Sequence, residues 1–294
     1  MGHKAIHSRV RLAAIVLFLL FVASALGAGP VNVVAAENFY GNIVQQLGGD
    51  AVHVTSILSD PNVDPHEYES NFDDAKAIAA ADLVVENSGG YDDWMDKLMG
   101  ASPRASRVLL KGYDLAVVKL PDNEHVWYNV DNVQAIAQAI TDALRKLDKA
   151  DAASFASRLQ TFTSSLTSIK KKLADMRARW QGAPVGLTET IFLYQAVPLG
   201  LNVLTPMEFQ QAMAEGNDPP ADTVVTAEDQ VKNKKIKVLI YNEQTVSPVT
   251  TRLQDDAKAA GIPVVPVTET MPSATSYQAW MLLQLSALDK ALGG

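Results

Sequence analysis

Short apolar runs alternate with amphipathic segments along the first half of the chain. The runs that have the length of buried strands are residues 31–36, 52–58, 83–86 and 108–110. The segments with helical periodicity are residues 40–47, 72–80 and 130–147. Strands that alternate with helices are typical of βαβ units, in which helices cover both faces of a parallel sheet. We therefore predict an α/β domain over residues 30–149.

Residues 151–180 contain no glycine or proline, and their apolar side chains recur at alternating steps of four and three. The members of this stripe are Phe155, Leu159, Phe162, Leu166, Ile169, Leu173, Met176 and Trp180. This spacing indicates a single helix of about 40–45 Å. A coiled coil would show the same stripe. We favour a rigid linking helix over residues 150–181, packed along two domains, because the α/β pattern resumes directly after it.

The second half repeats the alternation once Gly182 and Pro184 have ended the helix. Its expected strands are residues 185–187, 201–204, 238–241 and 262–267. Its expected helices lie around residues 190–198, 207–214, 226–232, 250–260 and 276–292. The predicted fold class is therefore α/β, with two Rossmann-like βαβ domains on parallel sheets, the second over residues 182–294. Ligands of such folds bind beyond the carboxyl ends of the strands, which favours a site between the domains.

The first 29 residues have the layout of a secretory signal peptide. Basic residues precede an apolar run at 12–22, and small residues follow at 23–28. Cleavage is plausible after Ala25 or Gly27. The run is too short to span a bilayer comfortably, although an uncleaved anchor is the alternative. We expect no membrane insertion of the mature chain.

Charge and cysteine content exclude several functions. The formal net charge is −8, so the chain has no basic surplus for a nucleic-acid partner. It contains no cysteine, which excludes disulfides, thiolate metal sites, thiol catalysis and lipid attachment through cysteine. A secreted protein without an anchor would be lost from a cell with a single membrane. We therefore expect a periplasmic protein.

Three histidines remain after the predicted signal. His53 alternates with valines and is expected on the exposed face of a strand, without a role. His66 lies in Asp-Pro-His-Glu-Tyr-Glu at 64–69, a loop stiffened by proline at the edge of the sheet. His125 precedes Val-Trp and is expected to be partly buried. Each of the last two is a candidate ligand, but a surface histidine or a packed, hydrogen-bonded one fits the same residues.

Three glutamates follow strands of the second domain. Glu189 lies where a strand gives way to a helix, and Glu269 follows the last strand. Both are expected at the same edge of their sheet. Taken singly, each also fits the ordinary role of a carboxylate at a helix N-terminus. Glu243 follows a third strand and is a structural candidate, or an alternative to Glu269 as a ligand.

Taken together, these segments resemble the metal-binding motifs of periplasmic solute-binding proteins, the zinc- and manganese-binding receptors of ABC importers. Residues 64–69 are very close to the first motif. Residues 123–127 resemble the second, usually Asp-Pro-His-x-Trp, in their histidine and tryptophan. Thr188-Glu189 with Tyr194 and Gly200 resembles the third in its manganese-type form. Residues 268–270 with Ser276-Tyr277 resemble the fourth, where aspartate is usual.

The resemblance implies a site with two ligands from each domain. The implied ligands are His66, His125, Glu189 and Glu269. Such a donor set suits Mn²⁺, Zn²⁺ or Fe²⁺. We favour Mn²⁺, because the site is rich in carboxylates and the chain lacks the histidine-rich loop of many zinc-specific members. The implied role is capture of the ion and delivery to an ABC permease and its ATPase, by a monomer. Some relatives also act as adhesins.

Two other functions fit the same architecture. A secreted zinc metallohydrolase would need an open coordination position and a placed base, as in His-Glu-x-x-His, which the chain lacks. A binding protein for an organic ligand would need a roomier cleft lined by aromatic side chains.

Overall fold

The computed structural model describes residues 29–60, 63, 65 and 68–294. The predicted signal segment, apart from Gly29, therefore lies outside the described residues. Residues 31–294 form one compact unit. No helix in the described part of the chain has the length and apolar character that crossing a membrane requires.

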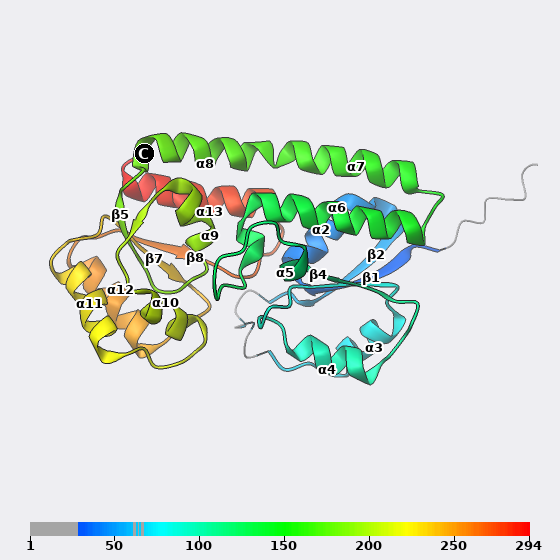
Figure 1. The fold of residues 1–294 in the computed structure, drawn as a ribbon, viewed down its shortest axis with the longest axis horizontal. Coiled ribbons are helices and arrows are strands. Elements are labelled where there is room, and N and C mark those ends of the chain that lie inside the picture. Colours follow the sequence, from blue (N-terminus) through cyan, green and yellow to red (C-terminus); the bar gives the residue numbers. More distant parts are fainter. Residues whose placement is uncertain (1–28, 61–62, 64, 66–67) are drawn as a thin grey trace, which may run out of the picture. The chain divides into compact units, whose positions relative to one another are not determined.

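The first sheet has four parallel strands in the order β2-β1-β3-β4. Its strands are β1 (Val31–Glu37), β2 (Val52–Leu58), β3 (Leu83–Glu86) and β4 (Val108–Lys111). Its helices are α2 (Asn38–Gly48), α3 (Phe72–Ala80), α4 (Trp94–Ala101), α5 (Gly112–Leu115) and α6 (Val130–Leu147). In Figure 1, α2 and α6 lie over one face of the sheet and α3 and α4 over the other. Every residue of β3 is buried because both faces are covered.

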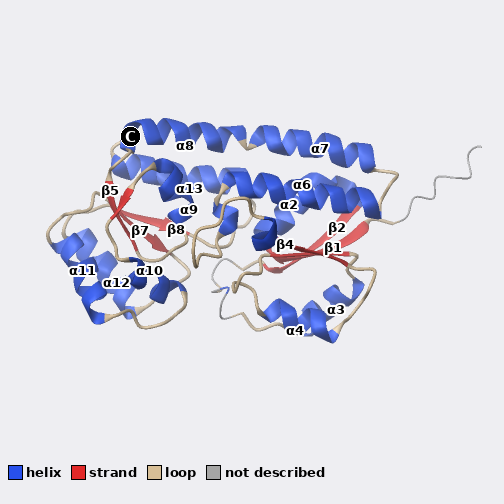
Figure 2. Cartoon of the chain, in the orientation of Figure 1, coloured by secondary structure: helices blue, strands red, loops and turns tan. Residues whose placement is uncertain are grey.

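The second sheet repeats this topology in the order β6-β5-β7-β8, again parallel. Its strands are β5 (Pro184–Leu187), β6 (Asn202–Val203), β7 (Leu239–Asn242) and β8 (Val264–Val267). Its helices are α9 (Leu193–Leu199), α10 (Met207–Ala214), α11 (Ala221–Lys232), α12 (Pro248–Ala259) and α13 (Tyr277–Leu292). Figure 2 shows helices on both sides of each sheet. The predicted fold class, α/β with two parallel sheets, is confirmed.

The expected linking helix consists of two helices placed end to end, α7 (Ala152–Ser165) and α8 (Thr167–Trp180). They meet at Leu166, whose backbone remains in the right-handed helical region with φ −65° and ψ −18°. The Ser165 hydroxyl donates to the carbonyl of Phe162 at 2.6 Å. This bond competes with the backbone hydrogen bonds of the helix at the junction. Helix α7 packs on α2 and α6, and α8 packs on α9 and α13. The segment therefore lies along both halves of the chain.

Asp289 on α13 ties the C-terminal helix to α8. Its carboxylate accepts hydrogen bonds from Lys172 Nζ, Arg179 Nη2 and Trp180 Nε1, each at 2.7 Å. Burial alone would raise the pKa of Asp289, but the three donors outweigh this effect and lower the pKa to about 2. The ionised carboxylate therefore stabilises the folded state above the ordinary aspartate pKa, and this stability is lost as the pH falls through about 2.

We predict that Asp289→Asn lowers the free energy of unfolding by about 2 kcal/mol at neutral pH. The difference from the wild type should shrink as the pH falls from about 4 to about 2, because the wild-type carboxylate is then protonated as well. Urea unfolding at several pH values measures both effects. Asp255→Asn is the control, because the Asp255 side chain is 68% exposed, and it should change stability by less than about 0.5 kcal/mol.

One face of α2 carries three amide side chains that contact the second half of the chain. Asn38, Asn42 and Gln46 are spaced four residues apart and therefore share this face. Asn38 Nδ2 donates to Met271 O at 2.7 Å, and Met271 N donates back to Asn38 Oδ1 at 2.9 Å. Asn42 Oδ1 accepts from the backbone N–H that begins α13, and Gln46 pairs with another amide on α13. These bonds fix the segment between β8 and α13 against α2.

Candidate metal site

His125 is fully buried at the start of the 3₁₀ turn η3 (Val126–Tyr128). Asn123 Oδ1 accepts from the backbone N–H of His125 at 3.1 Å and lies 3.0 Å from His125 Nδ1. Because an amide oxygen only accepts, this contact favours the tautomer of the neutral imidazole in which Nδ1 carries the proton and Nε2 has the lone pair. The imidazole is therefore prepared to bind a cation through Nε2.

Aromatic rings pack around this imidazole. Its ring centroid lies 5.2 Å from that of Trp127 and 5.9 Å from that of Tyr91. Trp127 in turn stacks on Phe39 of α2, with centroids 4.5 Å apart and an interplanar angle of 16°. These contacts explain why His125 is more deeply buried than the sequence predicted, and they hold its ring in one orientation.

Glu189 follows β5 and is 2% exposed. The preceding residue is anchored to β7, because Thr188 N donates to Ile240 O at 3.0 Å. Neither carboxylate oxygen of Glu189 accepts a well-formed hydrogen bond from the residues that the structure describes. A buried carboxylate without such partners is costly, and a cation is the partner that removes this cost.

Glu269 follows β8 and is fully buried. Its backbone N–H donates to Gln244 Oε1 at 2.7 Å, and its Oε1 accepts from Asn242 Nδ2 at 2.5 Å. Gln244 Oε1 also accepts from Thr270 N at 3.0 Å. Asn242 at the end of β7 therefore fixes the carboxylate of Glu269, and Gln244 just after β7 fixes its backbone.

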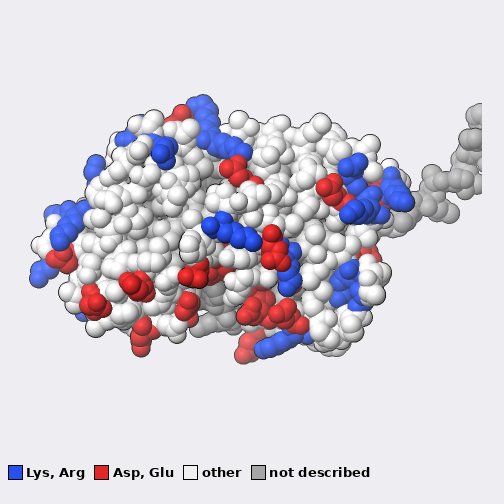
Figure 3. Space-filling model, in the orientation of Figure 1, with Lys and Arg blue, Asp and Glu red and all other residues white. Residues whose placement is uncertain are grey.

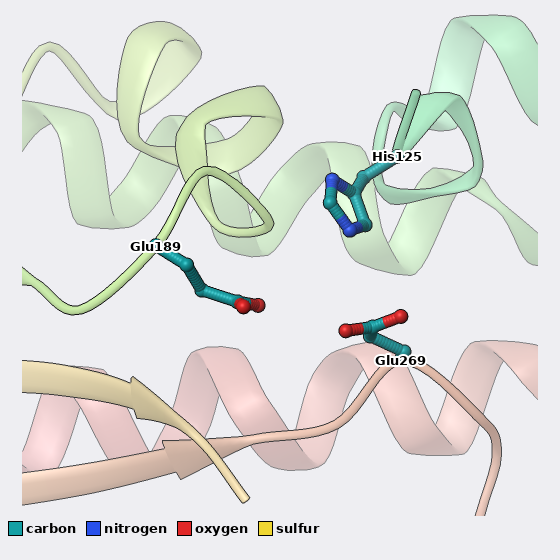
Figure 4. Close-up of side chains that lie close together, drawn as sticks. All are labelled: His125, Glu189 and Glu269. Carbon is teal, nitrogen blue, oxygen red and sulfur yellow. The ribbon is translucent and has the colours of Figure 1, made fainter. Parts of the chain in front are cut away.

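The side chains of His125, Glu189 and Glu269 converge on one point (Figure 4). Each offers a donor atom, and these atoms all lie within 4.8 Å of one another. Burial raises the pKa of Glu189 well above its usual range, and the neighbouring charge of Glu269 raises it further. Two carboxylates and one imidazole form a donor set that suits a divalent transition metal, whose charge would balance both carboxylates.

Hydrogen bonds join the three ligand-bearing segments to one another. Asn123 Nδ2 donates to Thr190 O at 2.8 Å and so links the His125 segment to the Glu189 segment. Tyr128 Oη donates to Thr268 O at 2.6 Å and links the His125 segment to that of Glu269. The donors are therefore held close together by supporting bonds, as a selective metal site requires.

The remaining histidines and the third glutamate that the sequence analysis considered are not part of the described cluster. His66 lies outside the described residues, so its position relative to the three buried side chains stays a prediction. Glu243 is exposed and does not belong to the cluster. His53 is exposed on β2, as predicted. The sequence interpretation missed Asn242 and Gln244, although strand alternation places both on the side opposite Glu243.

Surface charge is uneven on the face shown in Figure 3. Acidic side chains gather along the lower edge, over the loops and helices below the two sheets. Basic side chains are spread over the upper edge, the middle and both ends of this face. An acidic edge of this kind mildly raises the local concentration of cations.

The two parallel sheets and the buried imidazole–carboxylate cluster define an α/β protein whose donor set suits a bound cation. The chain belongs to the ZnuA family, described as the periplasmic component A of the zinc-uptake complex, whose model matches residues 33–291. The resemblance drawn from the sequence motifs is thereby confirmed. Members of this family are substrate-binding receptors.

Curated relatives support the same assignment. The metal ABC transporter substrate-binding lipoprotein ScbA of Streptococcus cristatus is 26% identical over 159 residues, which cover 50% of this chain and 51% of ScbA. A putative metal-binding protein of Thermotoga maritima is 32% identical over 113 residues, 38% of this chain and 40% of that protein. The chain thus spans about half the length, or less, of these curated relatives.

Solved structures share the fold over nearly the whole chain. The periplasmic zinc-binding protein TroA from Treponema pallidum superposes with a TM-score of 0.77 at 17% identity, covering 91% of this chain and 100% of TroA. The binding protein FpvC from Pseudomonas aeruginosa, solved in complex with Mn²⁺, has a TM-score of 0.71 at 20% identity, covering 90% and 98%. At these identities the likeness establishes the fold.

Proposed function

We propose that this protein captures one divalent transition-metal ion and delivers it to the permease of an ABC importer, which an ATPase drives. The observation that carries the proposal is the buried convergence of His125, Glu189 and Glu269 from three segments far apart in the chain. Relatives named as metal and manganese ABC transporter substrate-binding lipoproteins support it.

The proposed ligands are the three buried side chains together with His66. Two imidazoles and two carboxylates bind Mn²⁺, Zn²⁺ and Fe²⁺, and the two carboxylates favour the harder ions Mn²⁺ and Fe²⁺. We propose Mn²⁺ as the cargo, with Zn²⁺ as the strongest competitor. Four protein donors leave little room for an activated water, so the proposed role is binding and release rather than catalysis.

The proposed location is the periplasm, reached through the signal segment 1–29. The streptococcal relatives are named lipoproteins, whereas this sequence holds no cysteine to which a lipid could be attached. We propose that the mature protein acts as a monomer. Its two domains, 30–149 and 182–294, would be joined by the linking segment 150–181.

Metal titration tests the proposal. Chelator-treated protein titrated with Mn²⁺ or Zn²⁺ in a calorimeter, with bound metal counted by mass spectrometry, should bind one ion per chain. His125→Ala removes the imidazole that the described residues contribute to the buried cluster and should weaken binding by about 100-fold or more. His66→Ala should have a comparable effect with the fold retained.

His53→Ala is the matched control, because His53 is exposed on β2. It should bind metal with an affinity within about twofold of the wild type. A wild-type protein that binds neither ion, or a His125→Ala variant that binds as tightly as the wild type, would exclude the proposed function.

A further inference from the structure

Glu124 is a carboxylate at the rim of the cluster, directly before His125. Its side chain is 17% exposed, whereas the side chain of His125 is 0% exposed. Glu124 Oε1 lies 3.8 Å from His125 Nε2, the ring nitrogen that is left to bind a cation. Glu124 therefore reaches from the solvent-accessible rim to the coordinating side of the imidazole.

The distance from Glu124 to His125 is compatible with donors to the same ion. Two atoms that each bind one ion at about 2.1 Å lie about 3–4 Å apart, depending on the angle between them. The observed 3.8 Å falls within this range. The charge of Glu124 also reaches Glu189, whose pKa is raised first by burial, then by Glu269 and further by Glu124.

The backbone of Glu124 is held in place. Its carbonyl oxygen accepts from Asn87 Nδ2 at 3.0 Å and from Val126 N at 2.7 Å. Asn87 is itself fixed, because its Oδ1 accepts from Tyr40 Oη of α2 at 2.8 Å. These bonds hold the main chain of Glu124 beside the imidazole of His125.

We propose that Glu124 supplies an additional carboxylate donor to the bound ion and biases the site toward Mn²⁺ or Fe²⁺ over Zn²⁺. This inference rests on the proposed function. Zn²⁺ is usually satisfied by four donors. Mn²⁺ favours a larger, octahedral shell rich in carboxylate and other oxygen donors. A further carboxylate donor therefore increases the affinity for Mn²⁺ more than the affinity for Zn²⁺, because Mn²⁺ has coordination positions left to fill. It also adds negative charge beside either ion.

Glu124→Gln tests this role, because glutamine keeps the size of the side chain and removes the anionic donor. Calorimetric titration should show the affinity for Mn²⁺ falling about 10–100-fold. The affinity for Zn²⁺ should fall by less than about threefold, so that the selectivity shifts toward Zn²⁺. Glu243→Gln is the matched control, because it removes the same charge from an exposed position outside the cluster.

Glu124→Asp separates direct coordination from a general effect of charge. Aspartate keeps the charge but is shorter by one methylene, so direct coordination predicts that this variant also loses affinity for Mn²⁺. Wild-type affinity for Mn²⁺ in either variant, or an equal loss of Mn²⁺ and Zn²⁺ affinity, would overturn the role of Glu124. Failure of the wild type to bind either ion would instead overturn the proposed function. Thermal unfolding of each metal-free variant verifies the fold.

Discussion

Replacement of Glu189 by glutamine should weaken metal binding by about 100-fold or more and make the metal-free protein more stable than the wild type. The first effect follows from the loss of an anionic donor among the three converging side chains. The second follows from the position of Glu189, which is 2% exposed and lies near the charge of Glu269. Without a bound cation, the buried carboxylates of the site destabilise the folded state.

The stability that Glu189→Gln adds to the metal-free protein should depend on pH in one direction. Burial, and then the charge of Glu269, raise the pKa of Glu189 above its usual value of about 4.5. Between that value and the raised one, the folded state holds a proton that the unfolded state releases, so stability falls as the pH rises. The advantage of Glu189→Gln in the metal-free protein should therefore be about 1–3 kcal/mol at neutral pH and smaller at about pH 5.

Urea unfolding and metal titration of the same preparations measure both effects. Glu243→Gln again serves as the control, because it changes the net charge equally at an exposed position. A Glu189→Gln variant that binds metal as the wild type does, or that is less stable without metal, would contradict this interpretation of the buried carboxylates.

Trp127→Ala should lower the free energy of unfolding by about 3–5 kcal/mol. Trp127 is fully buried, stacks on Phe39 and lies 4.6 Å from Tyr91 between ring centroids. Its removal leaves a cavity beside the imidazole of His125, so metal affinity should fall as well. Chemical unfolding of the metal-free protein measures the loss of stability separately from metal binding.

Trp127→Phe preserves an aromatic ring against Phe39 and should lose no more than about half as much stability as the alanine variant. If Trp127→Ala lost less than about 1 kcal/mol, the aromatic packing around His125 would not hold the site as described.

The repeating elements of the fold were predictable because buried parallel strands are short apolar runs. The eight strands of the two sheets lie close to the expected ranges. Helix α4 was missed, although Trp94, Met95 and Leu98 mark its buried face. Helix α11 begins at Ala221, five residues before the predicted start at 226, and the missed first turn includes Val224 and Val225, whose β-branched side chains weaken the helical signal.

The apolar stripe at 151–180 predicted a helix on both sides of Leu166 but carried no sign of the junction, where the hydroxyl of Ser165 bonds to the carbonyl of Phe162. The domain boundaries stay a prediction. Residues 31–294 form one compact unit, and hydrogen bonds such as those between Asn38 and Met271 join its two halves.

The site was predictable only in part. Glu189 and Glu269 could be placed at one edge because parallel strands of a sheet end together. The bond from Tyr128 to Thr268 joins residues 140 positions apart, and the bond from Asn123 to Thr190 joins residues 67 positions apart. No local pattern encodes such pairs, since they form only when the two halves of the chain pack together.

A crystal structure of the protein with Mn²⁺, recorded with anomalous diffraction, tests the central claim most directly. We expect one manganese peak within about 2.0–2.3 Å of His125 Nε2 and of a carboxylate oxygen from each of Glu189 and Glu269. A manganese peak bound elsewhere, with these three side chains contacting no ion, would contradict the account.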